Sequence, residues 1–241
     1  PQFVRGLGIT PDWRTVFYTA SCLAVIAGIL IYWLGDGPHH SQRRRMHWGA
    51  VLNAFRGDGF RGAALGYFGH MWELYAFWAM VPFFIADIGQ GIEANATYFT
   101  ASLAFLAGAI GCMLGGVMSH RWGSGRVAIV ALMGSAGMCL VYPFLHELTY
   151  GLAIGGLLVW GFFVVADSPQ FSALAAGACS KEDVGGALAF MNSIGFAVSI
   201  VSIELVTRYW SLQNEYVAWM LLPGPLFGLW AMRRFWRRPA S

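Results

Sequence analysis

Residues 148–166 read LTYGLAIGGLLVWGFFVVA and contain no charged side chain. The hydrocarbon core of a bilayer is about 30 Å thick, so a helix needs about 20 apolar residues to cross it. A helix at the surface of a soluble protein would carry a polar face, which this stretch lacks. The stretch therefore predicts a helix that spans a membrane.

The same pattern recurs along the chain. Six further apolar stretches lie at 16–34, 63–85, 98–118, 127–145, 184–206 and 216–232. The last is short and contains Pro223 and Pro225, which predicts a kinked or broken helix, because proline removes a backbone donor and clashes with the preceding turn. We expect an all-α fold: a polytopic membrane helix bundle with seven spans.

The composition agrees with a membrane protein. Of the 241 residues, 57% are hydrophobic and 11% are charged, whereas soluble domains have about 25% charged residues. An ordinary soluble enzyme and a disordered chain are excluded on this ground. The net charge of +3 is too small to indicate a nucleic-acid partner, so the first partner we expect is the lipid bilayer.

Basic residues are concentrated in alternate loops. Twelve of the 15 basic residues lie in four segments: after the first stretch, between the third and the fourth, between the fifth and the sixth, and after the last. Positive charge collects on the cytoplasmic side of membrane proteins. We therefore expect a multi-pass protein of the cell (inner) membrane, with the N-terminus of this chain outside and its C-terminus in the cytoplasm. Because the chain begins at Pro1 without an initiator methionine, we also expect a part upstream.

One long polar segment divides the chain. Residues 35–62 are basic and rich in glycine, while every later loop is short. We expect three regions: an outside segment with the first span at 1–34, a basic cytoplasmic central linker at 35–62, and a six-span bundle with a basic tail at 63–241. Short loops make neighbouring helices antiparallel, so the six spans should form one compact unit.

The second apolar stretch carries the ionisable groups that lie deepest in the membrane. His70 and Glu73 are three residues apart near its middle, with Tyr67 and Tyr75 close by. Ionisable side chains at this depth are costly and usually face a cavity or a partner. We expect them, with Asn192 of the sixth stretch, to line a substrate or proton cavity. The alternative is an internal hydrogen-bonded pair that fixes two helices, and for Asn192 an interhelical hydrogen bond.

Small residues recur at helical spacing. Gly111 and Gly115 form one GxxxG pattern, and Gly151 and Gly155 form another. Such patterns let helix backbones approach closely in lipid. Tight packing of helices is the simpler interpretation. The alternative is that these small residues form smooth faces along which neighbouring helices rock past each other.

Enzyme chemistry has little support in the sequence. Nucleophile elbows, zinc-protease motifs, phosphate loops and dinucleotide fingerprints are missing from the 241 residues. Lys181 lies in a loop, which excludes a retinal protein, and only His70 among six histidines is deep, which excludes a membrane b-type cytochrome. The four cysteines lack metal-ligand spacing and read as small packing residues. We expect no catalytic residue, no cofactor and no metal.

The segment 115–126, GGVMSHRWGSGR, joins the third and fourth stretches. It resembles the loop motif of major facilitator superfamily transporters, G-G-x-x-x-D-R-x-G-R-[RK]. His120 stands where the motif has aspartate, which weakens the carry-over of an aspartate-based gate to this loop. The matching residues are Gly115, Gly116, Arg121, Gly123 and Arg126, the last after one inserted residue.

The resemblance assigns a gating loop to Gly116, Arg121, Gly123 and Arg126. Asp167 ends the fifth stretch on the same side of the membrane, where Pro169 is expected to stop the helix. We expect Asp167 to cap that helix or to pair with a nearby arginine, with a gating role as a further possibility.

The resemblance also implies an architecture. Because the motif joins the second and third helices of each half of these transporters, the chain resembles the C-terminal half, helices six to twelve. The second and fifth stretches would then correspond to helices seven and ten, which line the central cavity. This implies a secondary active transporter that moves a small solute by alternating access, as an ion- or proton-coupled symporter or antiporter, completed by a missing N-terminal half.

Glu73 is the first candidate for the coupling group and His70 is the second. The alternative function is that of a non-transporting membrane scaffold or half-size subunit.

Overall fold

The computed structural model describes residues 12–34, 48–89 and 94–236, and within these ranges every regular element is a helix. The expected outer segment at 1–11, the tail at 237–241 and the first part of the predicted linker, 35–47, lie outside the described residues. The helices are α2 (Trp13–Leu34), α3 (Trp48–Arg56), α4 (Asp58–Ile88), α5 (Ala94–Trp122), α6 (Ser124–Val141), α7 (Tyr150–Ala166), α8 (Ser168–Gly177), α9 (Val184–Gln213) and α10 (Pro223–Trp236), with two 3-10 helices, η1 (Tyr142–Glu147) and η2 (Asn214–Met220).

Six of the described helical segments are long and apolar enough to cross a bilayer, which confirms the all-α membrane class. The seventh predicted span is shorter than expected. Helix α10 has 14 residues, and it begins at Pro223 after η2 has ended at Met220. The predicted break is therefore present, because proline fits the first turn of a helix but not its interior.

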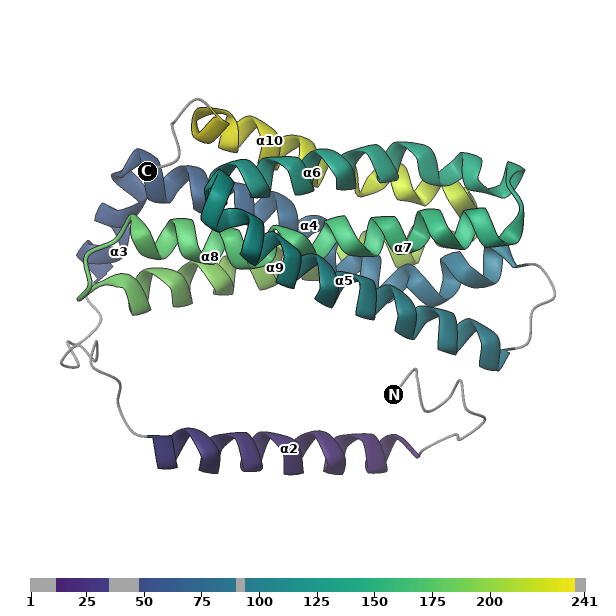
Figure 1. Ribbon diagram of the computed structural model, residues 1–241, viewed down its shortest axis with the longest axis horizontal. Coiled ribbons are helices and arrows are strands. Elements are labelled where there is room, and N and C mark those ends of the chain that lie inside the picture. Colours follow the sequence, from purple (N-terminus) through teal and green to yellow (C-terminus); the bar gives the residue numbers. More distant parts are fainter. Residues whose placement is uncertain (1–11, 35–47, 90–93, 237–241) are drawn as a thin grey trace.

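Helix α4 is the centre of the bundle. It packs against α10 and α9, and also contacts α8, α5, α7 and α3. Helix α5 packs along α7, and α6 packs against α7 and α10. The helices from α4 to α10 form one elongated bundle with their axes roughly along its length (Figure 1).

Helix α2 lies apart from this bundle (Figure 1). None of the apolar window of this helix is buried, and its large side chains are exposed, Trp33 to 83%. Helix α3 occupies part of the region predicted as linker, and α4 begins at Asp58, before the predicted start of the second span at 63. The basic linker is thus partly helical where the structure describes it.

Glycines allow two very close helix crossings. A Cβ atom placed on Gly111 of α5 would lie 2.3 Å from the carbonyl oxygen of Phe162 in α7, and one on Gly69 of α4 would lie 2.4 Å from that of Gly224 in α10. These contacts leave no room for a side chain, which is the geometry that small residues permit in lipid. By contrast, no heavy atom of the described residues lies within 4 Å of the corresponding position on Gly151 or Gly155. The packing interpretation therefore holds for the first GxxxG pattern and not for the second.

Candidate functional site on helix α4

The polar side chains predicted on the second span are buried inside the bundle. His70 and Glu73 are each 1% exposed. Three positions on a helix turn by about 300°, so the two side chains leave α4 in somewhat different directions. They reach different neighbouring helices and form two separate clusters.

The Glu73 carboxylate accepts three donors through one oxygen. Oε1 accepts hydrogen bonds from the Ser135 hydroxyl at 2.5 Å, from Trp160 Nε1 at 2.7 Å and from the Cys139 thiol at 3.2 Å. Ser135 and Cys139 are one turn apart on α6, which places both on one face, and Trp160 comes from α7. The network links α4 to two helices that are distant in sequence.

The second cluster pairs His70 with Asp167. His70 Nδ1 lies 2.9 Å from Asp167 Oδ1, and both side chains are almost fully buried. The rings of Tyr67 and Phe171 flank the imidazole at 5.9 and 5.7 Å between centroids. Among the residues that the structure describes, His70 Nε2 has no hydrogen-bond partner. A buried imidazole with one ring nitrogen beside a carboxylate and the other unpartnered can hold or release a proton.

Asp167 occupies a break between two helices, which corrects the expectation for it. Its side chain makes no capping hydrogen bond to α7 or α8, and its close partner is His70 rather than an arginine. Pro169 does not stop the chain's helical course, because it lies in the first turn of α8, where its missing N–H costs nothing. Residues Tyr150–Gly177 therefore form one membrane-length segment with Asp167 buried in it.

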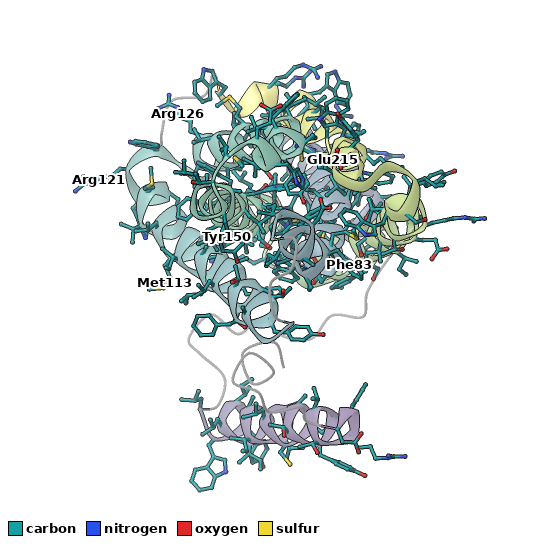
Figure 2. All side chains as sticks on the ribbon, turned by 90° about the vertical axis from the view of Figure 1, so that its right-hand side faces the viewer. Phe83, Met113, Arg121, Arg126, Tyr150 and Glu215 are labelled. Atoms are coloured by element: carbon teal, nitrogen blue, oxygen red, sulfur yellow. The ribbon has the colours of Figure 1, made fainter. Side chains whose placement is uncertain are left out.

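The turn between α5 and α6 contains the motif residues. Gly123 has φ 80° and ψ 145°, a conformation that residues with a side chain rarely adopt. Its N–H donates to the Ser119 carbonyl, which closes the end of α5. Arg121 is exposed and points away from the bundle, while Gly116 and Arg126 are half-buried (Figure 2). A turn that requires glycine at this motif position agrees with the resemblance.

The sequence of the chain matches the family model described as Major Facilitator Superfamily over residues 3–203, which is most of its length. The chain belongs to the Major Facilitator Superfamily. It is a multi-pass membrane protein of a transporter family. A search of curated proteins found no match.

Within this superfamily chain, the remaining predicted residues are spread over different surroundings. Tyr67 lies beside His70, as expected for one stripe. Tyr75 is half-buried and packs instead against Trp78 and against Phe196 of α9, at 5.3 and 5.5 Å between ring centroids. Asn192 is exposed on α9 and is not buried with them. Their role in a substrate cavity stays a prediction.

The partners of Glu73 lie on helices that the sequence does not place beside α4. Ser135, Cys139 and Trp160 come from the fourth and fifth apolar stretches. A signal existed, since Ser135 and Cys139 are four apart inside an otherwise apolar run and share a helix face. That spacing does not tell which helix lies opposite, so the pairing with Glu73 required the fold.

Proposed function

We propose that this superfamily chain is part of a secondary active transporter that couples movement of a small solute to protons. The observation that carries the proposal is the His70–Asp167 pair, buried between α4 and the α7–α8 break. Ionisable groups inside a membrane protein are expensive to keep, and in transporters they commonly bind ions or protons. Glu73, one turn further along α4, is the second proton-binding group in this proposal.

A change in protonation at this pair would alter how α4 is held against the α7–α8 break. When His70 is protonated and Asp167 is ionised, the two side chains attract; when His70 loses its proton, that charge attraction is lost. Helix α4 and the α7–α8 segment would then be free to adopt a second arrangement. Alternating access needs two such arrangements whose relative populations are set by proton and solute.

The rest of the molecule would come from outside the described bundle. We propose that an N-terminal half of the same protein completes it beside α2, which lies apart from the described bundle. We also propose the inner membrane as location and a cytoplasmic C-terminus, on the basis of the arginine distribution. The solute and the direction of transport depend on the complete binding site.

A second candidate function, a non-transporting membrane scaffold, is favoured by one observation. All three donors to Glu73 come from neighbouring helices of the same bundle, which is also what an interhelical link requires. In that case the polar clusters would contribute stability and no proton movement.

The test uses the full-length protein in proteoliposomes loaded with a pH-sensitive dye. A panel of sugars, amino acids, organic anions and organic cations is screened under an inward proton gradient, with a protonophore as control. We expect at least one solute to enter together with protons. The Asp167→Asn and His70→Asn variants should lose coupled uptake at least tenfold, while the control Glu147→Gln, at an exposed carboxylate outside both clusters and the motif loop, keeps it.

The result that would overturn the coupling role is wild-type uptake with unchanged pH dependence in both Asp167→Asn and His70→Asn. Glu73→Gln is tested in the same way, and unaltered transport and pH dependence would remove Glu73 from the assignment. Absence of uptake for the whole panel, with all variants losing only thermal stability, would favour the scaffold. Elution as a single detergent-solubilised species checks that each variant is folded.

A further inference from the structure

Three side chains with metal-binding atoms converge at the end of the bundle that lies opposite the α5–α6 turn. Asp87 comes from the last turn of α4, His146 from η1 and Glu215 from η2. One ligand atom from each lies within 4.8 Å of the other two. Figure 2 views the molecule from this end and labels Glu215. The three residues are far apart in sequence, so only the fold brings them together.

The spacing of these atoms suits a small divalent cation. Asp87 Oδ2 lies 3.1 Å from His146 Nε2. Zinc binds nitrogen and oxygen ligands at about 2.0–2.2 Å in tetrahedral geometry, which places neighbouring ligand atoms about 3.3–3.6 Å apart. The aspartate and histidine are therefore almost at the required separation, and the ligand atom of Glu215 lies within 4.8 Å of both.

The charges at this end also favour a cation. The carboxylates of Asp87 and Glu215 lie close together, and the His146 imidazole lies beside them. Asp87 Oδ2 is covered from solvent, and within the described part of the chain it accepts no hydrogen bond, although His146 Nε2 is close. A covered carboxylate oxygen without a donor is costly, and a metal ion would satisfy it and separate the two negative charges.

We propose that Asp87, His146 and Glu215 form a binding site for Zn²⁺ at this end of the transporter. The imidazole selects zinc over Ca²⁺ and Mg²⁺, which prefer oxygen ligands alone. Three protein ligands leave a fourth position of the tetrahedron for water. The bound ion would connect the end of α4 to both turns, η1 and η2, and so restrain the three segments relative to one another. This site goes beyond the proposed transport function and does not depend on it.

The experiment measures zinc binding to the full-length protein in detergent after treatment with a chelator. Because His39, His40 and His47 could bind zinc by themselves, all proteins carry alanine at these three positions. Zinc is titrated against a fluorescent indicator, and thermal unfolding is recorded with and without ZnCl₂. We expect one zinc ion per chain and a higher unfolding temperature in its presence.

His146→Ala and Glu215→Gln should weaken zinc binding at least tenfold and abolish the thermal shift, whereas His120→Ala, at an exposed histidine near the opposite end, should change neither. X-ray absorption of the zinc-loaded protein provides a second measurement that needs no variant, with one nitrogen and otherwise oxygen ligands expected. Equal zinc binding in His146→Ala, no zinc binding in the alanine background, or equal affinity for Ca²⁺ would each overturn the proposal.

Discussion

The side chain of Glu73 shows how a carboxylate is accommodated among apolar helices. Its Oε1 atom accepts hydrogen bonds from a hydroxyl, an indole N–H and a thiol, contributed by two other helices. Hydrogen bonds to a charged acceptor are stronger than neutral ones. Trp160 has a further role, because its ring stacks on Phe84 with 5.6 Å between centroids and 17° between planes.

Replacement of Trp160 by phenylalanine removes the N–H donor and keeps an aromatic ring at this position. We expect a loss of roughly 1–3 kcal/mol of stability, from one hydrogen bond to a buried carboxylate and a small loss of packing. Unfolding in detergent, followed by thermal melting, is the measurement. In a Glu73→Gln background the same substitution should cost less, whereas Trp122→Phe, at an exposed tryptophan, should be neutral in both. Strictly additive effects of the two substitutions would show that the hydrogen bond adds no stability.

Depth in an apolar run was enough to identify His70 and Glu73 as buried polar residues. Their partners were not predictable, because helical spacing gives the direction of a side chain relative to its own helix only. Asp167 lies at a helix end, between α7 and α8, as the sequence indicated, but its partner is His70 rather than a backbone N–H group or an arginine. Pro169 can end one helix or begin the next, and here it lies in the first turn of α8.

At the scale of helices, glycine determines where two backbones can touch. The two GxxxG patterns have the same sequence form, but only the one in α5 lies against another helix, α7. Exposure of the second pattern on α7 could not be read from its spacing. Which face of a uniformly apolar helix is covered depends on its neighbours, since no polar stripe marks the other face.

Gly111→Ala tests this difference. The added methyl group would lie 2.3 Å from a backbone carbonyl oxygen of α7, so the helices must separate. We expect a loss of roughly 1–3 kcal/mol, the usual cost of overpacking. Gly155→Ala is the matched control, with no atom within 4 Å, and it should leave stability unchanged or slightly higher, since alanine favours helix over glycine. The apparent melting temperature in detergent is the readout, and equal shifts for both variants would contradict the crossing.

For the whole molecule, the distribution of arginine predicts orientation in the membrane. The α5–α6 turn and the start of α7 lie at opposite ends of the bundle, as the antiparallel course of α6 requires (Figure 1). The superfamily match and the membrane-length helices agree on a multi-pass protein. Neither observation assigns a side of the membrane to either end, so orientation stays a prediction.

Cysteine labelling of intact cells tests the orientation. In a background without the four native cysteines, single cysteines are introduced as Gly151→Cys and His120→Cys, both at exposed positions. With the arginine-rich ends in the cytoplasm, a membrane-impermeant maleimide should label position 151 in intact cells and position 120 only after permeabilisation. The reverse pattern would invert the topology and place the proposed zinc site in the cytoplasm.

The residue order alone was sufficient to predict the helical membrane class, because a lipid environment requires long apolar helices. It was also sufficient for the break near Pro223 and for the superfamily, whose loop motif has glycine where the turn at Gly123 requires it. Folding in three dimensions was needed to join His70 to Asp167, to bring three donors to Glu73, and to gather Asp87, His146 and Glu215 at one end. The reason is physical: hydropathy and periodicity act within a helix, whereas these contacts depend on which helices lie side by side. That arrangement follows from close packing between small residues and from polar groups that must find partners inside the bundle.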